Sequence, residues 1–173
     1  MKAKVIFILI VLTVIIFFDG CEKEKENQTS TDFSGKLTSY SACKNFKSTQ
    51  TEFDTPDTLC CVDYSFDASA NKLIINHINS GFNCCPEILY CTIALKSDTI
   101  IIQEDEKEAG CNCLCLFDLD MEITGVESKK YQVKLIEPYT GDQEKLEFEM
   151  DLIKDKSGSV CVVRKNYPWG VYH

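Results

Sequence analysis

The chain has 173 residues, a formal net charge of −9 and 11 cysteines, but only two histidines and one tryptophan. So acidic a chain is repelled by the phosphates of nucleic acids and by anionic membrane surfaces, which excludes both as partners bound through charge. The chain is long enough to bury a core of its own.

The N-terminus has the pattern of a secretory signal peptide. Two lysines precede an apolar run over residues 5–18, which is too short for a membrane span of about 20 residues. The run ends at Asp19-Gly20-Cys21, which resembles a bacterial lipobox, whose cysteine is lipidated and becomes the first residue. The sequence therefore predicts a lipoprotein signal peptide over residues 1–20 and a lipid anchor, with acyl chains such as palmitate, on Cys21. An uncleaved anchor helix is the alternative.

Residues 21–32 are expected to form a charged flexible tether. After the cysteine this segment contains no apolar residue, so it cannot bury surface. Its charged start also resembles the surface-export signal of Bacteroidota lipoproteins. We therefore expect a chain at the outer membrane or cell surface, held to the membrane by its N-terminal lipid, with anchoring that faces the periplasm as the alternative.

Residues 33–173 are predicted to form one all-β domain. Short segments of alternating apolar and polar residues are separated by turn sequences, and no helical period follows the signal peptide. The expected strands are 59–67, 72–78, 88–95, 99–103, 113–125, 130–137, 145–152 and 159–164. This pattern predicts a single antiparallel two-sheet sandwich of about eight strands, stapled by disulfides.

Ten cysteines remain if Cys21 carries lipid, and in an exported domain an even number favours disulfides. The candidates are Cys43, Cys60, Cys61, Cys84, Cys85, Cys91, Cys111, Cys113, Cys115 and Cys161. Cysteines two apart on a flat strand have Cβ atoms roughly 7 Å from each other, too far for a disulfide. Adjacent cysteines point to opposite faces of a strand and so need separate partners. We expect the pair at 84–85 to bond to the group at 111–115.

The alternative for this sulfur-rich group is a thiolate metal site at Cys84, Cys85 and the cysteines of residues 111–115. The usual Cys-x-x-Cys spacing is absent, and three ligands along one flat strand are too far apart to share a tetrahedral ion. A redox site would need a Cys-x-x-Cys at the start of a helix. We therefore expect no cofactor and no metal ligand, with a cysteine-based metal-handling protein as an alternative function.

No group of residues in the sequence indicates catalysis. His77 lies in a predicted strand without a Gly-x-Ser-x-Gly motif nearby, so we interpret it as structural. Acidic pairs such as Asp118 and Asp120 alternate with apolar residues, as on a solvated face of a strand. Residues 104–108 are expected to form a charged hairpin tip, where a cation would bind only incidentally.

Tyr167, Trp169 and Tyr172 form the densest aromatic group outside the expected core. Exposed, these rings could stack on sugars or anchor a protein partner. Buried, they would hold the C-terminus against the domain. Both interpretations stay open from the sequence.

The segments Cys84-Cys-Pro, Cys111-Asn-Cys-Leu-Cys and Tyr167-Pro-Trp-Gly together resemble a group of small cysteine-rich Bacteroidota lipoproteins. The resemblance implies a compartment and a one-domain architecture, and it transfers no catalytic residue. We expect an envelope or cell-surface lipoprotein that acts as a non-catalytic binding or structural module, with a protein or glycan as partner. A carbohydrate-binding or carbohydrate-processing surface protein is the first alternative and metal handling the second.

Overall fold

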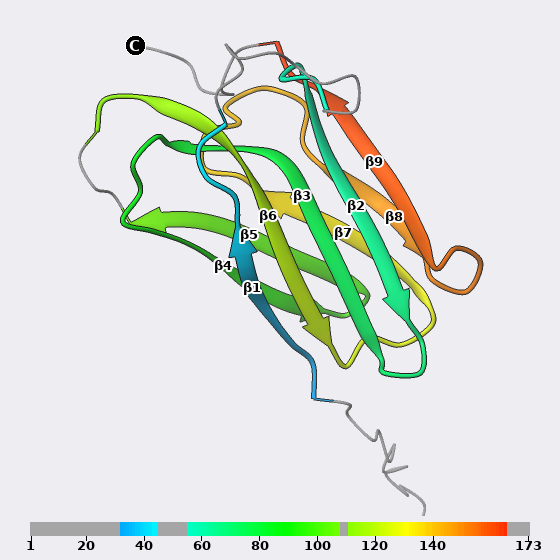
Figure 1. Cartoon of the computed structure of the whole chain (residues 1–173). Helices are drawn as coiled ribbons and strands as arrows, with labels where there is room; N and C mark the ends of the chain where they lie inside the picture. Colours follow the sequence, from blue (N-terminus) through cyan, green and yellow to red (C-terminus); the bar gives the residue numbers. More distant parts are fainter. Residues whose placement is uncertain (1–31, 45–54, 108–110, 166–173) are drawn as a thin grey trace, which may run out of the picture.

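The computed structural model describes residues 32–44, 55–107 and 111–165, which form strands and their connections (Figure 1). The strands are β1 (Ser34–Tyr40), β2 (Leu59–Asp67), β3 (Lys72–Asn83), β4 (Ile88–Lys96), β5 (Thr99–Lys107), β6 (Leu114–Thr124), β7 (Lys130–Ile136), β8 (Glu147–Asp151) and β9 (Ser157–Val163). The described residues include no helix of the length and apolarity that a membrane span requires. Cys21, the signal peptide, the tether up to residue 31 and the aromatic residues Tyr167, Trp169 and Tyr172 lie outside the described residues.

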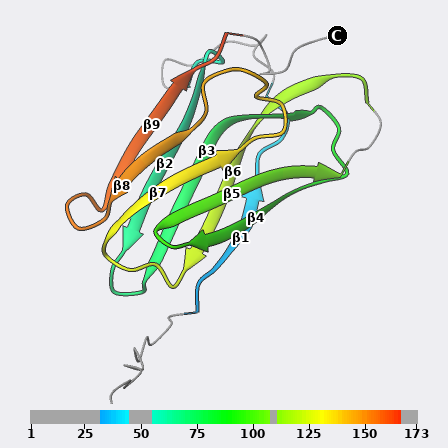
Figure 2. The same ribbon diagram turned by 180° about the vertical axis from the view of Figure 1, so that it is seen from behind.

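The strands form two packed sheets, which confirms the predicted all-β sandwich. One sheet has the order β1-β6-β3-β2-β9 and the other the order β4-β5-β7-β8; Figure 1 shows the first in front and Figure 2 the second. All neighbouring strands are antiparallel except β5 and β7, which are parallel. The parallel pair arises because the chain leaves the second sheet after β5, forms β6 in the first sheet, and returns for β7.

The core lies between the two sheets and follows the predicted alternation of period two. On β6 the residues Leu119, Met121 and Ile123 are fully buried, while the acidic residues between them are partly exposed. On β7 the alternate residues Tyr131 and Val133 face them from the second sheet and are at most 1% exposed. Burial of each aliphatic side chain of this kind contributes roughly 1.5–3 kcal/mol.

β3 is longer than predicted because a bulge stands where the sequence indicated a turn. Asn79 has a φ of +64°, a conformation that asparagine adopts more readily than most residues. Its backbone N–H donates to the Asp118 carboxylate at 2.9 Å, and its side-chain amide donates to the Leu59 carbonyl at 2.8 Å. These bonds hold the extra residue in place, and the strand continues after a register shift between His77 and Ser80.

Two further differences from the predicted elements bear on function. β1 was not predicted because Leu37 is the one aliphatic residue among its seven. β5 continues to Lys107, so most of the acidic segment predicted as a hairpin tip belongs to a strand. As a result Glu104 is not at an exposed tip but is buried, with 2% of its surface exposed.

Four disulfides join distant parts of the described chain. They are Cys43–Cys115, Cys61–Cys161, Cys84–Cys113 and Cys85–Cys111. The expected bonding of residues 84–85 to the group at 111–115 is confirmed, and the cysteines of that group bond elsewhere rather than to one another. Each disulfide is expected to stabilise the fold by about 2–4 kcal/mol.

The structure differs from the expected five disulfides at Cys60 and Cys91, which are free thiols. Adjacent cysteines do point to opposite faces: Cys61 bonds to β9, whereas Cys60 points into the core. Cys60 lies against His77 rather than a sulfur. An even number of cysteines therefore did not mean that all of them pair.

Candidate functional site

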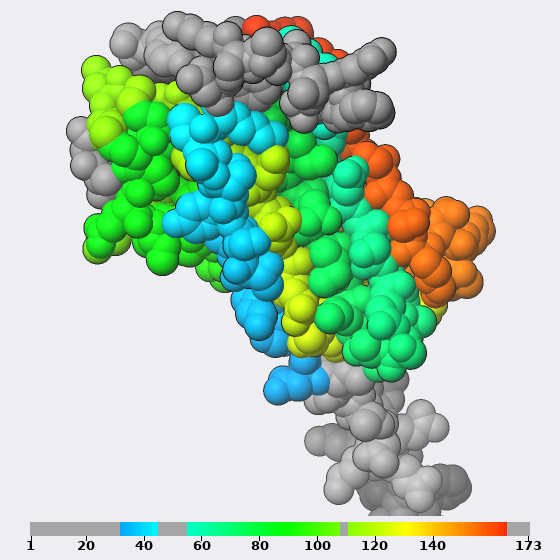
Figure 3. All heavy atoms as spheres, viewed as in Figure 1, coloured from blue at the N-terminus to red at the C-terminus, as the bar shows by residue number. Residues whose placement is uncertain are grey.

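An open groove lies between β1 and β4, the two edge strands on the same side of the sandwich. Within the described ranges each strand has a single hydrogen-bonded neighbour, β6 for β1 and β5 for β4. In the space-filling view β1 runs along the surface between the green β4–β5 hairpin and the yellow-green β6 (Figure 3). The groove has a volume of about 410 Å³ and is lined by residues 35–40 and 88–91.

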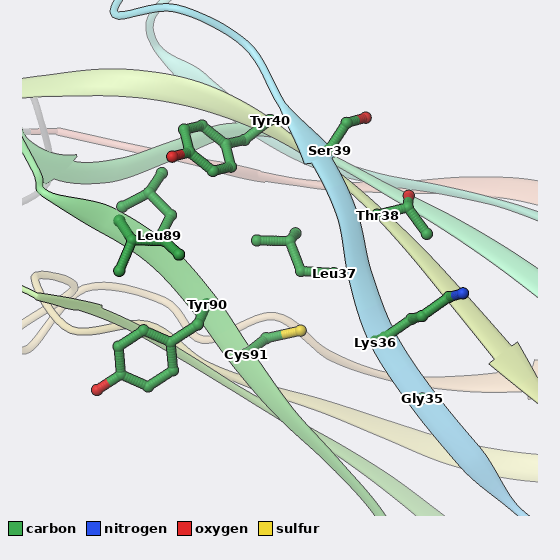
Figure 4. A pocket seen from close by; sticks show the side chains of 10 residues that line it. Gly35, Lys36, Leu37, Thr38, Ser39, Tyr40, Leu89, Tyr90 and Cys91 are labelled. Carbon is green, nitrogen blue, oxygen red and sulfur yellow. The ribbon is translucent and has the colours of Figure 1, made fainter.

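The groove is closed at one end and widens towards the other. At the closed end the two strands almost touch, because a Cβ added to Gly35 would lie 2.6 Å from the Cβ of Ile93. Only glycine allows this approach. From there the ribbons diverge towards Tyr40 and Leu89 (Figure 4).

A second bulge determines which side chains of β1 point into the groove. The register with β6 shifts between Leu37 and Ser39, so Leu37 and Tyr40 both point towards β4, although they are three residues apart (Figure 4). Thr38 and Ser39 point away, and their hydroxyls donate to the carbonyl and the carboxylate of Asp120 at 2.9 and 2.6 Å. The bulge thus places an aliphatic and an aromatic side chain on one wall.

Cys91 projects from β4 towards Leu37 at the centre of the groove (Figure 4). Burial raises the pKa of its thiol to about 11, and the negative charge of Glu104 adds to this, while the Leu37 backbone N–H acts in the opposite direction. At neutral pH this thiol is therefore protonated and a weak nucleophile. Its chemistry is that of a small apolar group.

Exposed apolar residues gather at this groove. Of the six large hydrophobic side chains that are exposed in the described part of the chain, Tyr40, Ile88 and Tyr90 line it, with 40%, 49% and 43% of their surfaces exposed. A concave, largely apolar surface with a few polar groups is typical of a binding site.

A second group of functional side chains is buried between the sheets and is called here the polar cluster. It consists of Cys60, His77, Ser80, Glu104, Glu137 and Arg164. The His77 ring joins its two halves: Nδ1 is 2.6 Å from Glu104 Oε1, and Nε2 is 3.0 Å from Cys60 Sγ. The Ser80 hydroxyl donates to the other oxygen of Glu104 at 2.7 Å.

The other half of the polar cluster is an ion pair. Arg164 Nη2 lies 2.5 Å from Glu137 Oε2 and 3.5 Å from Cys60 Sγ. Glu137 Oε1 lies 3.5 Å from the same sulfur and 3.9 Å from His77 Nε2. The side chains of Arg164 and Glu137 are at most 2% exposed, so these charges interact without solvent screening.

The bulge in β3 makes the polar cluster possible. His77 continues the inward-facing series of Leu73 and Ile75, and without the bulge the next inward positions would be 79 and 81. Before the bulge the odd-numbered residues face inward, and after the extra residue the even-numbered ones do, so that Ser80 also faces inward. One carboxylate, that of Glu104, can therefore accept from both His77 and Ser80.

The electrostatics of the polar cluster favour charged side chains. Burial alone would lower the pKa of His77, but the carboxylate of Glu104 and the sulfur of Cys60 outweigh it and raise the pKa well above its ordinary value. Burial likewise opposes the charge on Arg164, and Glu137 and Cys60 raise the pKa of its guanidinium.

The sequence interpretation of these residues was incomplete. His77 was taken as structural and Cys60 as a disulfide candidate, and Glu104 was assigned to an exposed tip. A signal was present: Glu104 follows Ile100 and Ile102 at the same parity, and Glu137 and Arg164 likewise continue the inward-facing positions of β7 and β9. The metal ligands considered from the sequence, Cys84, Cys85 and the group at 111–115, are instead engaged in disulfides.

Comparison with known proteins finds no family model, no curated protein and no solved structure that matches this chain.

Proposed function

We propose that the chain is a lipid-anchored protein of the outer membrane or cell surface, whose sandwich domain is a non-catalytic binding module. The N-terminal sequence supports the anchor at Cys21. Four disulfides in the described chain support an oxidising, extracytoplasmic compartment.

The ligand that best fits the β1–β4 groove is an extended polypeptide segment of a partner protein. The observation that carries this proposal is the group of exposed apolar residues Tyr40, Ile88 and Tyr90 on the two sheet edges that line the groove. An extended segment pairs its backbone with the edge of a strand and places alternate side chains in the adjoining pocket. Leu37, Leu89 and Cys91 would contact those side chains, and Tyr40 would cover them.

A matched pair of isoleucines tests the groove. Ile88 lies in the groove and is 49% exposed, whereas Ile153 lies elsewhere and is 63% exposed. Peptides are selected on the full chain from a random peptide library, and their affinity is measured for Ile88→Ala and Ile153→Ala. We expect Ile88→Ala to weaken binding about tenfold and Ile153→Ala to leave it unchanged. Equal affinity for both variants would overturn the groove as the binding site.

A glycan array probed with the same full chain distinguishes carbohydrate binding from peptide binding. Its sequence support comes from Tyr167, Trp169 and Tyr172, which lie outside the described residues. Glycan binding that disappears in Trp169→Ala, without selection of any peptide, would replace the peptide ligand by a sugar. Peptide binding that is insensitive to Trp169→Ala supports the groove.

A further inference from the structure

We propose that the polar cluster contains a binding site for one divalent zinc-like metal ion, with Cys60 Sγ, His77 Nε2 and Glu137 Oε1 as its ligands. These three atoms come from β2, from β3 and from the residue after β7, and all three lie within 4.8 Å of one another. The site differs from the groove, and the inference does not depend on the proposed binding function.

The spacing of the three donor atoms fits one tetrahedral ion. Around zinc, with bonds of about 2.0–2.3 Å to nitrogen, oxygen and sulfur, neighbouring ligand atoms lie about 3.3–3.6 Å apart. Here the sulfur lies 3.0 Å from the nitrogen and 3.5 Å from the oxygen, and the nitrogen and oxygen are 3.9 Å apart. Changes of roughly half an ångström in the sulfur–nitrogen and nitrogen–oxygen distances bring these atoms to the required spacing. One coordination position is then left for a water molecule.

The residues that hydrogen-bond to the three ligands have the arrangement commonly found around metal ions in proteins. A histidine ligand usually donates its second ring N–H to a carboxylate, which fixes the tautomer and orients the ring. Here Nδ1 of His77 faces Glu104 at 2.6 Å, so Nε2 points to Cys60 and Glu137. Ser80 in turn holds the second oxygen of Glu104.

Arg164 binds the carboxylate oxygen of Glu137 that is not the proposed metal ligand. Its guanidinium donates to Oε2 of Glu137 at 2.5 Å, while the proposed ligand is Oε1. The arginine therefore orients the carboxylate and offsets part of its charge. Arg164 therefore supports the ligand from behind and does not fill the position of the metal ion.

The charges of the polar cluster match a divalent cation. With Cys60 bound as a thiolate, the sulfur and the carboxylates of Glu104 and Glu137 carry three negative charges, and Arg164 carries one positive charge. The excess of two negative charges, in a region without solvent, is balanced by one divalent ion. The ion takes the place of two protons, one on Cys60 Sγ and one on His77 Nε2, and both are released to solvent when it binds.

The donor set indicates which ion binds. One thiolate, one imidazole and one carboxylate together suit zinc, whereas calcium and magnesium prefer oxygen ligands alone. Cys60 and His77 are completely buried, and the Glu137 side chain is 2% exposed. A site so enclosed is expected to take up its ion as the domain folds.

The test loads zinc during folding. The full chain, exported through an oxidising compartment and purified in detergent, is unfolded in urea with its disulfides intact and refolded with zinc. Excess metal is removed, and bound zinc is measured for the wild type, Cys60→Ser and Cys91→Ser. Cys91→Ser is the matched control, because Cys91 is the other free thiol of the described chain. We expect about one zinc ion per chain for the wild type and Cys91→Ser, and less than about a tenth of that for Cys60→Ser.

Two results would overturn the proposal: no stoichiometric zinc in the wild type, or equal zinc in the wild type and Cys60→Ser. If Cys60→Ser fails to fold, the site is tested without changing it. The double variant Cys21→Ser, Cys91→Ser leaves Cys60 as the one cysteine outside the four disulfides. After refolding with cobalt, its spectrum is expected to show a thiolate-to-cobalt charge-transfer band. The absence of that band would equally reject the site.

Discussion

The polar cluster and the β1–β4 groove reverse the usual distribution of residues in a protein, in which apolar side chains are buried and charged side chains are exposed. In the polar cluster, charged and polar side chains are packed between the sheets, whereas the groove exposes tyrosine and isoleucine to solvent. Each region contains one of the two free cysteines of the described chain. Cys60 is surrounded by charged groups that satisfy one another. Cys91 projects towards Leu37 and has Glu104 as its partner on the neighbouring strand.

The difference shows that the two regions are maintained by different forces. The polar cluster depends on charge pairing in a region of low dielectric constant, where removal of one partner leaves another uncompensated. The groove depends on the shape of two strands that diverge from a glycine contact, and its apolar surface is available for a ligand. Each of the following predictions either compares the two regions directly or changes one region and compares the variant with a matched control.

The largest effect is expected from breaking the ion pair inside the polar cluster. Arg164→Met removes the guanidinium 2.5 Å from Glu137 and leaves a carboxylate buried without its cation. We expect the free energy of unfolding, measured by urea denaturation at pH 7, to fall by about 3–5 kcal/mol. Lys130→Met is the control, since its pair with Glu149 is more than half exposed and should contribute little. Equal losses for the two variants would show that charge does not maintain the polar cluster.

The next largest effect is a difference in reactivity between the two free thiols. With a pKa of about 11 rather than 9.0, Cys91 has about a hundredfold less thiolate at pH 8 than an unstructured cysteine. We expect its alkylation to be slower by about that factor and to accelerate about tenfold per pH unit. Cys60 is fully buried and should react only when the domain unfolds. Peptide mapping by mass spectrometry measures both, and labelling of Cys60 before Cys91 in the native protein would contradict the prediction.

Much of the fold follows from the sequence because the signal is local. The alternation of Leu119, Met121 and Ile123 with acidic residues identified β6 and its buried face. The geometry of adjacent and alternate cysteines limited the disulfides enough to predict the bonds between residues 84–85 and the group at 111–115. These inferences need only the period of a strand and the reach of a disulfide.

The two candidate sites could not be predicted because each depends on a feature without a strong local signal. The groove needs β1, whose single aliphatic residue, Leu37, gives no alternation. The polar cluster needs the bulge at Asn79, since an Asn-Ser-Gly sequence equally indicates a turn. It also needs five segments of the chain to converge. The alternation along β5 places Glu104 on an inward face, but it does not show which residues Glu104 contacts there.

A moderate effect is expected where β1 and β4 touch. In Gly35→Val the new Cβ would lie 2.6 Å from the Cβ of Ile93, so the strands must separate. We expect a loss of about 1–3 kcal/mol in the free energy of unfolding, together with weaker binding of the selected peptides. Lys36→Val is the control, because this side chain points away from β4 (Figure 4). Ile93→Ala should restore part of the loss in the double variant, and strict additivity of the two changes would contradict a contact between them.

The smallest effect is a pH dependence of stability in the metal-free protein. The pKa of His77 results from burial, which favours the neutral ring, and from Glu104 and Cys60, which outweigh it; Glu137 and Arg164 complete its surroundings. Because the pKa is raised on folding, the contribution of His77 is fully present below its ordinary value of 6.5. It is lost as the pH rises through the folded-state value. We expect the free energy of unfolding, measured in a chelator, to fall by at most about 1.4 kcal/mol per pH unit from this group.

The two histidines of the chain identify the source of that pH dependence. His77→Gln removes the titrating ring from the polar cluster, so the decline in stability above pH 6.5 should become shallower. His173→Gln changes the other histidine, at the C-terminus, and should leave the decline as it is in the wild type. The reverse result, a decline that persists in His77→Gln and disappears in His173→Gln, would mean that the polar cluster does not hold a charged imidazole. The contrast between a charged interior and an apolar groove would then rest on Arg164, Glu104 and Glu137.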